Sequence, residues 1–131
     1  MVQGKCFYSE KDRKDFKDAK ENCKYKGGKL YEPKDIDKMK EVLIKSGLGH
    51  DWALIGIKDI SAKASEGNYA YDSNNRSINF SPTFASSRYG ARGISHNCNV
   101  VLAGHNSLQF QFGKFYDILC STSSYQSICE L

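Results

Sequence analysis

The chain has 131 residues, of which 40% are hydrophobic and 26% charged, and its net charge is +4. These proportions are ordinary for a globular protein and exclude an intrinsically disordered chain, and the length suits a single domain over residues 1–131 with one hydrophobic core. No apolar run approaches the roughly 20 residues of a membrane helix, so we expect no membrane insertion.

The basic excess lies in the first third of the chain, where residues 1–45 hold 13 of the 19 Lys and Arg and 9 of the 15 Asp and Glu. The two signs alternate there, in KDRKDFKDAKENCKYK, which is typical of solvated helix faces. The chain has one tryptophan and no stripe of aromatic and basic residues on which bases would stack. We therefore expect no nucleic-acid partner.

A first helix is predicted from Asp12, a suitable N-cap residue, with Asp15 in the first turn. Its apolar stripe consists of Phe16, Ala19 and Cys23, at the spacing of one helix face. Gly27 and Gly28 end it.

A second helix is predicted to open at Pro33 and to stop at Gly47. Its apolar stripe consists of Ile36, Met39, Val42 and Leu43. After residue 50 the pattern changes to short strands, which we expect at 53–57, 67–71, 99–102, 108–112 and 127–130, with a turn at 72–75. Two helices followed by many short strands predict an α+β fold.

Residues 76–97 form a long polar segment with little periodicity, and a loop of that length in a compact domain is usually functional. Two sequons, Asn75-Arg-Ser and Asn79-Phe-Ser, fit the N-glycosylation pattern. No spacing indicates a Ser-His-Asp or Cys-His arrangement or a phosphate-binding glycine loop, so we predict a protein that is not an enzyme.

The chain has five cysteines, none in a CxxC pair, and its three histidines have no usual zinc spacing. Two disulfide bonds with one cysteine left over is our interpretation, and the alternative is five buried free thiols in a cytosolic protein. No apolar signal-peptide segment precedes the domain, so the chain is either intracellular or a mature chain with a new Met. The cysteines favour the second, a secreted protein.

Several short motifs, taken in chain order, point to one family. The first predicted helix carries an aromatic residue, an alanine and a cysteine, and Gly-Gly-Lys-Leu follows it. The second predicted helix is followed by a strand with the sequence Leu-Ile-Gly-Ile. Three further motifs come later in the chain. They are Glu-Gly-Asn-Tyr-Ala-Tyr, then a segment of eight residues that ends in a cysteine, and finally Ile-Cys-Glu. The residues are 16–23, 27–30, 54–57, 66–71, 113–120 and 128–130. Together they resemble the C-type lectin-like domain, over about residues 6–130.

The resemblance implies two helices packed on short antiparallel sheets, a long-loop region at about 76–97, and two disulfide bonds. These are Cys23–Cys129 and Cys98–Cys120. Cys6 is left over, either as a free thiol or as half of an interchain disulfide that would give a homodimer.

Sugar-binding members of the family hold calcium in the long loop, and Ca²⁺ requires six to eight oxygen ligands. The resemblance places the family's ligand triplet near Arg88-Tyr89-Gly90 and its acidic residue at His96. Its later Asn-Asp pair falls on Tyr116-Asp117, so Asp117 alone remains a plausible ligand. From Ser73 to Tyr116 there is no Asp or Glu at all, whereas four Lys or Arg lie there. We therefore expect no calcium and no other cofactor.

The same residues suggest what replaces the metal. Arg88 either pairs with Asp117 as a structural salt bridge or joins Arg92, His96 and Arg76 in a cationic patch for an anionic ligand. Tyr89 and Tyr116 would add a face for a sugar ring or a protein side chain.

Two classes of partner remain open: an anionic, sulfated or sialylated carbohydrate, and a protein that contacts the long loop. A third class, a structural, ice-binding or mineral-binding protein, has little support from the sequence. Mineral binders tend to be acidic, whereas this loop is basic.

Overall fold

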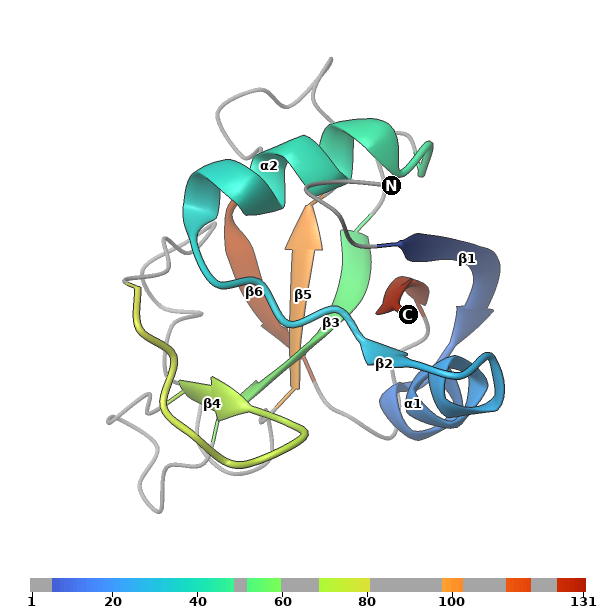
Figure 1. The fold of residues 1–131 in the computed structure, drawn as a ribbon, viewed down its shortest axis with the longest axis horizontal. Helices are drawn as coiled ribbons and strands as arrows, with labels where there is room; N and C mark the ends of the chain where they lie inside the picture. Colours follow the sequence, from blue (N-terminus) through green and yellow to red (C-terminus); the bar gives the residue numbers. More distant parts are fainter. Residues whose placement is uncertain (1–5, 49–51, 60–68, 81–97, 103–112, 119–124) are drawn as a thin grey trace.

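The computed structural model describes residues 6–48, 52–59, 69–80, 98–102, 113–118 and 125–131 (Figure 1). This part of the chain forms two helices and seven strands. They are β1 (Phe7–Lys14), α1 (Phe16–Tyr25), β2 (Lys29–Leu30), α2 (Ile36–Lys45), β3 (Trp52–Asp59), β4 (Tyr69–Tyr71), β5 (Cys98–Leu102), β6 (Phe115–Ile118) and β7 (Tyr125–Glu130). The predicted α+β class is confirmed. Neither of these helices is long and apolar enough to cross a membrane.

The strands form one sheet in the order β1-β7-β3-β5-β6, with β2 paired to β7 and β4 paired to β3. All pairs are antiparallel except β3 and β7, which run parallel with Ala53 opposite Gln126 and Leu54 opposite Ser127. The expected antiparallel pairing is thus present in every described strand pair but this one, which makes the sheet mixed. Hydrophobic alternation marks which residues form a strand, but it carries no information on the direction of the neighbouring strand.

Helix α1 begins later than predicted. Its N-cap is Asp15, whose Oδ1 accepts a hydrogen bond from the Asp18 backbone N–H at 2.8 Å. Asp12 is not the cap, because extended backbone continues through β1 until Lys14 pairs with Tyr125 of β7. The predicted end is confirmed, since Gly27 has φ of 91°, a conformation that glycine adopts without a side-chain clash.

Helix α2 likewise begins at Ile36 and not at Pro33. Its N-cap is Asp35, which accepts from the Lys38 N–H at 2.8 Å. The carbonyl of Pro33 is used elsewhere, accepting a hydrogen bond from the Tyr71 hydroxyl at 2.7 Å. Beyond the helix Gly47 has φ of 73°, as its predicted role in stopping the helix requires.

The core has two parts, one on each face of β3. Ala53, Ile55 and Ile57 pack with the buried residues of α2, namely Met39, Val42 and Leu43. The intervening Leu54 packs with Ala19 and Cys23 of α1. Because successive strand residues point to opposite faces, α1 and α2 cover opposite faces of the sheet. Figure 1 shows α2 beside β3, β5 and β6, and α1 beside β2.

Tyr31 joins the α2 side of the core. It is 5% exposed and packs edge-on against Phe7, with ring centroids 5.2 Å apart. Burial raises the pKa of the Tyr31 hydroxyl, and the nearby Glu130 carboxylate raises it further.

Tyr31 should make the fold sensitive to alkali. Its pKa is higher in the folded state, so above the ordinary tyrosine pKa the unfolded chain releases a proton that the folded chain keeps. Stability therefore falls as pH rises past about 10, and by pH 11 one such tyrosine costs about 1.4 kcal/mol. Between pH 9 and 11, the free energy of unfolding should fall by about 1.4 kcal/mol less in Tyr31→Phe than in the parent, as measured by urea titration. Tyr25, which is 90% exposed, supplies the control: if Tyr25→Phe gives the same relief, the assignment to Tyr31 is wrong.

Candidate functional site

Four of the predicted site residues, Arg88, Tyr89, Arg92 and His96, lie outside the described residues. Tyr116 and Asp117 lie in β6, where their backbones pair with Val100 and Asn99 of β5. Asp117 is therefore opposite the residue that follows Cys98, at the point where the long segment re-enters the sheet. The roles assigned to all six residues stay predictions.

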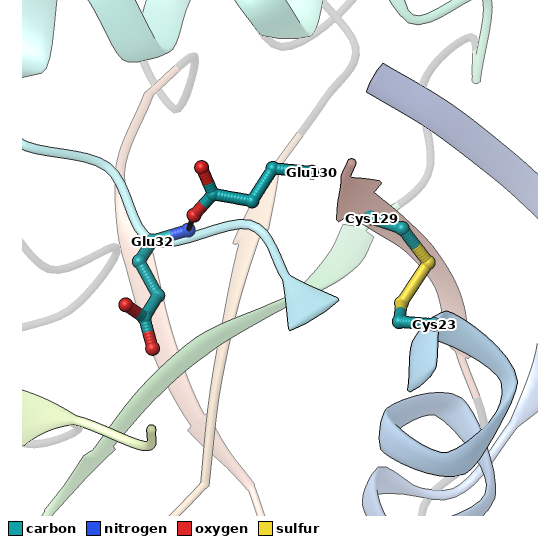
Figure 2. The surroundings of a disulfide bond; sticks show 4 residues. All are labelled: Cys23, Glu32, Cys129 and Glu130. Atoms are coloured by element: carbon teal, nitrogen blue, oxygen red, sulfur yellow. Dashed lines mark hydrogen bonds between the residues drawn. A yellow bond between two sulfur atoms is a disulfide. The ribbon is translucent and has the colours of Figure 1, made fainter. Parts of the chain in front are cut away.

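The Cys23–Cys129 disulfide is confirmed, with Cα atoms 5.3 Å apart (Figure 2). It joins α1 to β7, and both cysteines are fully buried. The predicted partner of Cys98 lies outside the described part of the chain, so that bond is untested. Cys6 is exposed and forms no disulfide with a described cysteine of its own chain, so the choice between a free thiol and an interchain disulfide stays a prediction.

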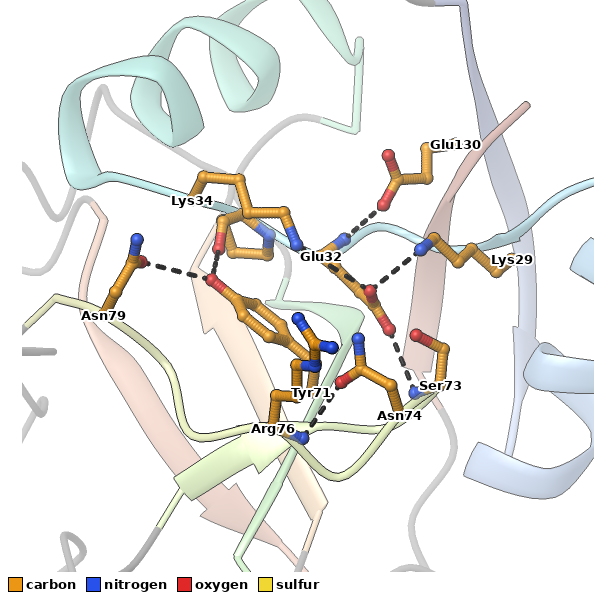
Figure 3. Close-up of polar contacts among 10 residues, drawn as sticks. Lys29, Glu32, Lys34, Tyr71, Ser73, Asn74, Arg76, Asn79 and Glu130 are labelled. Carbon is orange, nitrogen blue, oxygen red and sulfur yellow. Dashed lines mark hydrogen bonds and ion pairs between the residues drawn. The ribbon is translucent and has the colours of Figure 1, made fainter.

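A buried carboxylate, Glu32, organises a polar network that the sequence interpretation missed (Figure 3). Its side chain is 1% exposed, and Oε1 lies 3.0 Å from the Lys29 ammonium and 3.9 Å from that of Lys34. Its Oε2 accepts a hydrogen bond from the Ser73 backbone N–H at 3.0 Å. The Glu32 N–H in turn donates to Glu130 Oε1 at 2.9 Å, as Figures 2 and 3 show. The network thus connects β2, the turn after β4, and β7.

Asp72, directly after β4, is a second buried carboxylate. It lies 2.8 Å from the Lys20 ammonium and 3.5 Å from that of Lys58, and its side chain is 8% exposed. Its backbone N–H donates to the Gly56 carbonyl at 2.8 Å. The turn is thereby held against α1 and β3.

Gly56 makes this arrangement possible. Its N–H donates to the Tyr31 carbonyl at 2.7 Å, which brings the two backbones close together. A Cβ at Gly56 would lie 2.9 Å from both Glu32 Cγ and the Leu30 carbonyl oxygen, distances that real Cβ atoms do not show. Glycine is thus needed here to admit the segment that carries Glu32.

The carboxylates of the network change the pKa values of the side chains around them. The hydrogen bond to Glu32 raises the pKa of Lys29, so this side chain stays cationic at neutral pH. Burial raises the pKa of Tyr71, and Glu32 and Glu130 add to that shift. The Lys34 ammonium lies 3.8 Å from the centroid of the Tyr71 ring, a cation–π contact.

Only weak sequence signals pointed to this network. Glu32 lies directly between the apolar pair Leu30-Tyr31 and Pro33, and Asp72 directly follows a buried strand. An acid beside buried residues indicates a paired carboxylate, because an unpaired one is costly to bury. Within the residues described, no three His, Cys, Asp or Glu side chains gather as metal ligands.

Comparison with known proteins gives no relative by sequence: no family model matches the chain, and no curated protein is significantly similar to it. Solved structures do match. The carbohydrate-recognition domain of the mouse scavenger receptor C-type lectin superposes with a TM-score of 0.74 at 20% identity, covering 100% of this chain and 92% of that one. The chain has the C-type lectin-like fold.

Two other solved structures with this lectin-like fold differ in their use of calcium. One, a calcium-independent type II antifreeze protein, has a TM-score of 0.74 and 20% identity, and covers 100% of this chain and 88% of that one. The other, a Ca²⁺-dependent type II antifreeze protein in its Ca²⁺-free form, also has a TM-score of 0.74, with 15% identity and coverage of 100% and 94%. The lectin-like fold therefore does not itself decide whether calcium is bound.

Proposed function

We propose that this lectin-like domain is a secreted, non-enzymatic recognition module that binds an anionic, sulfated or sialylated carbohydrate through its long-loop face without calcium. One observation carries the proposal: residues 73–116 contain no carboxylate but include Arg76, Arg88, Arg92 and Lys114. Guanidinium groups bind sulfate and carboxylate bidentately, so such a segment suits an anion.

The register of β5 and β6 supports the place of the site. Arg88, Arg92 and His96 precede Cys98 in sequence, and Asp117 lies opposite Asn99 in the sheet. A single carboxylate at that point is a poor calcium site, because Ca²⁺ takes six to eight oxygen ligands and arginines raise the local potential.

The structural neighbours support a recognition role in general terms. One is the carbohydrate-recognition domain of a lectin, and another is calcium-independent. The buried Cys23–Cys129 disulfide supports an oxidising, extracellular location.

The alternative is a calcium-independent protein–protein interface on the same loop face, with Tyr89 and Tyr116 as contact residues. Tyrosine and arginine are the residue types enriched at such interfaces, which favours this alternative over an enzyme.

Binding to a heparin column at low salt tests the proposal. Arg88→Gln/Arg92→Gln should elute at clearly lower salt than the parent, because two phosphate- or sulfate-type contacts are lost. The triple variant Lys11→Gln/Lys14→Gln/Lys17→Gln controls for the basic N-terminal part. A glycan array with and without EDTA then separates the two classes of ligand. Unchanged elution of the Arg88/Arg92 variant would contradict the carbohydrate site, and an array without hits favours a protein partner.

The exposed thiol of Cys6 permits a covalent homodimer, which we include in the proposal. Electrophoresis of the protein made in a secretory host should show a dimer-sized band that a reducing agent converts to monomer. The Cys6→Ser variant should run as a monomer in both conditions. A monomer-sized band for the parent without reductant removes the dimer.

A further inference from the structure

A pocket of about 380 Å³ lies on the α1 face of the sheet, and none of its described lining residues is assigned to the long-loop site. Its volume falls within the roughly 300–1,000 Å³ of small-molecule sites. Charged residues from α1, β2 and the segments that follow β2 and β4 are among its described lining residues. Those used below are Lys20, Lys24, Lys29, Glu32 and Asp72.

The ion pairs around this pocket leave positive charge in excess. Glu32 is shared by the ammonium groups of Lys29 and Lys34, at 3.0 and 3.9 Å. Asp72 is shared in the same way by Lys20 and Lys58, at 2.8 and 3.5 Å. Of these four lysines, Lys20 and Lys29 line the pocket together with the two carboxylates.

Lys24 is the third lysine among the described lining residues. It lies one helical turn after Lys20 on α1, is exposed, and lines the same pocket. Within the part of the chain that the structure describes, no carboxylate pairs with its ammonium group. The described lining residues thus include three lysines and two carboxylates, which leaves one positive charge in excess.

The two buried carboxylates also hold lysines in place at two sides of the pocket. Asp72 forms an ion pair with Lys20, and Glu32 forms one with Lys29. The two ion pairs are connected through the backbone, because Ser73, the residue after Asp72, donates its N–H to Glu32. Flexible side chains that are already positioned lose less entropy when a ligand binds.

We propose that this pocket binds a sulfate or phosphate monoester group on a sugar-sized ligand, with Lys20, Lys24 and Lys29 donating hydrogen bonds to its oxygens. A tetrahedral oxyanion offers three acceptor oxygens, and lysine ammonium groups bind such groups as compact point charges. The surplus of cations argues against a metal ion in the same place. None of its described lining residues belongs to the long-loop site, and the proposal does not depend on that site.

Titration with small ligands at low ionic strength tests the site. The probes are glucose 6-sulfate and glucose 6-phosphate, with glucose as the neutral control, followed by calorimetry and by the backbone amide resonances of Gly28, Gly56 and Ser73. We expect saturable binding of at least one charged sugar, with shifts at those amides, and none of glucose. The tighter of the two charged sugars identifies the class of monoester.

Lys24→Gln is the decisive variant, because Lys24 has no partner among the described residues whose loss would disturb the fold. It should weaken binding about tenfold, the effect of one lost charged hydrogen bond. Lys17→Gln is matched to it, since Lys17 is exposed on the same helix and does not line the pocket.

The outcomes separate this site from the long-loop site. Arg88→Gln/Arg92→Gln should leave titration of the charged sugars unchanged, whatever it does on the heparin column. Absence of saturable shifts at Gly28, Gly56 and Ser73, or equal weakening by Lys17→Gln and Lys24→Gln, would overturn the proposal.

Discussion

Replacing Cys23 and Cys129 together by alanine should lower the free energy of unfolding by about 4–5 kcal/mol. The bond connects residues separated by 106 positions, so its loss releases a long loop in the unfolded chain. The chain-entropy model assigns this range to loops of about 100 residues. Because a typical domain is stable by only 5–15 kcal/mol, the variant should be close to unfolding at 37 °C.

Urea denaturation without reductant, followed by the fluorescence of the single tryptophan, measures this loss. Cys6→Ser is the control, since Cys6 is exposed and unpaired within the chain and its replacement should change stability by less than about 0.5 kcal/mol. A loss below about 1 kcal/mol in the double variant would show that the disulfide contributes little to stability.

Gly28→Ala should be the second most damaging change, costing roughly 3 kcal/mol. A Cβ at Gly28 would overlap the carbonyl oxygen of Glu130, and both partners are backbone, so neither can move aside by rotating a side chain. Overpacking of this kind forces backbone shifts across the junction of β2 and β7.

The neighbouring glycine supplies a matched control. Gly27 has φ of 91°, but a Cβ there meets nothing within 4 Å. Gly27→Ala should therefore cost only the backbone strain, about 1 kcal/mol. Thermal or urea unfolding of the two variants measures the difference, and equal losses would mean that the close approach to Glu130 is not what requires Gly28.

Much of the fold could be predicted because it depends on local patterns. The stripe of Ala19 and Cys23 marked the buried face of α1, and the apolar run at 53–57 marked β3. Both helix starts are predicted too early, the first because Asp12 is also a chemically suitable cap and the second because proline suits the first turn of a helix. Pairing of β1 with β7 selected Asp15 over Asp12, and the contact between Pro33 and Tyr71 set the start of α2.

Strand β1 was missed because its sequence does not look like a strand. Residues 11–13 are charged and exposed, as suits the edge of a sheet, where charges discourage pairing with another chain. Its strand structure comes from β7, which lies more than 100 residues away in sequence. The expected strand at 108–112 lies outside the described residues.

The network around Glu32 could not be predicted from the sequence for a similar reason. Its partners are Lys29, which is close in sequence, and Ser73 and Glu130, which lie far along the chain. The contact with Ser73 depends on the place of the turn after β4, and the contact with Glu130 on the register between β2 and β7. No spacing in the sequence states that register. The long-loop site, in contrast, was inferred from a missing residue type, which a sequence displays directly.

The position of β7 constrains how the domain can fold as it is made. Strand β7 pairs with β1, β2 and β3, and the residues of these three strands all precede residue 60. Strand β7 itself is formed much later in synthesis, by residues 125–130. At about 5–20 residues per second, the early strands wait several seconds on the ribosome for their central neighbour. During that time β1 and β3 present unpaired backbone edges, and Cys23 lacks its partner. Chaperones that shield strand edges, and an oxidant that acts late, should therefore matter more for this domain than for one built from local contacts.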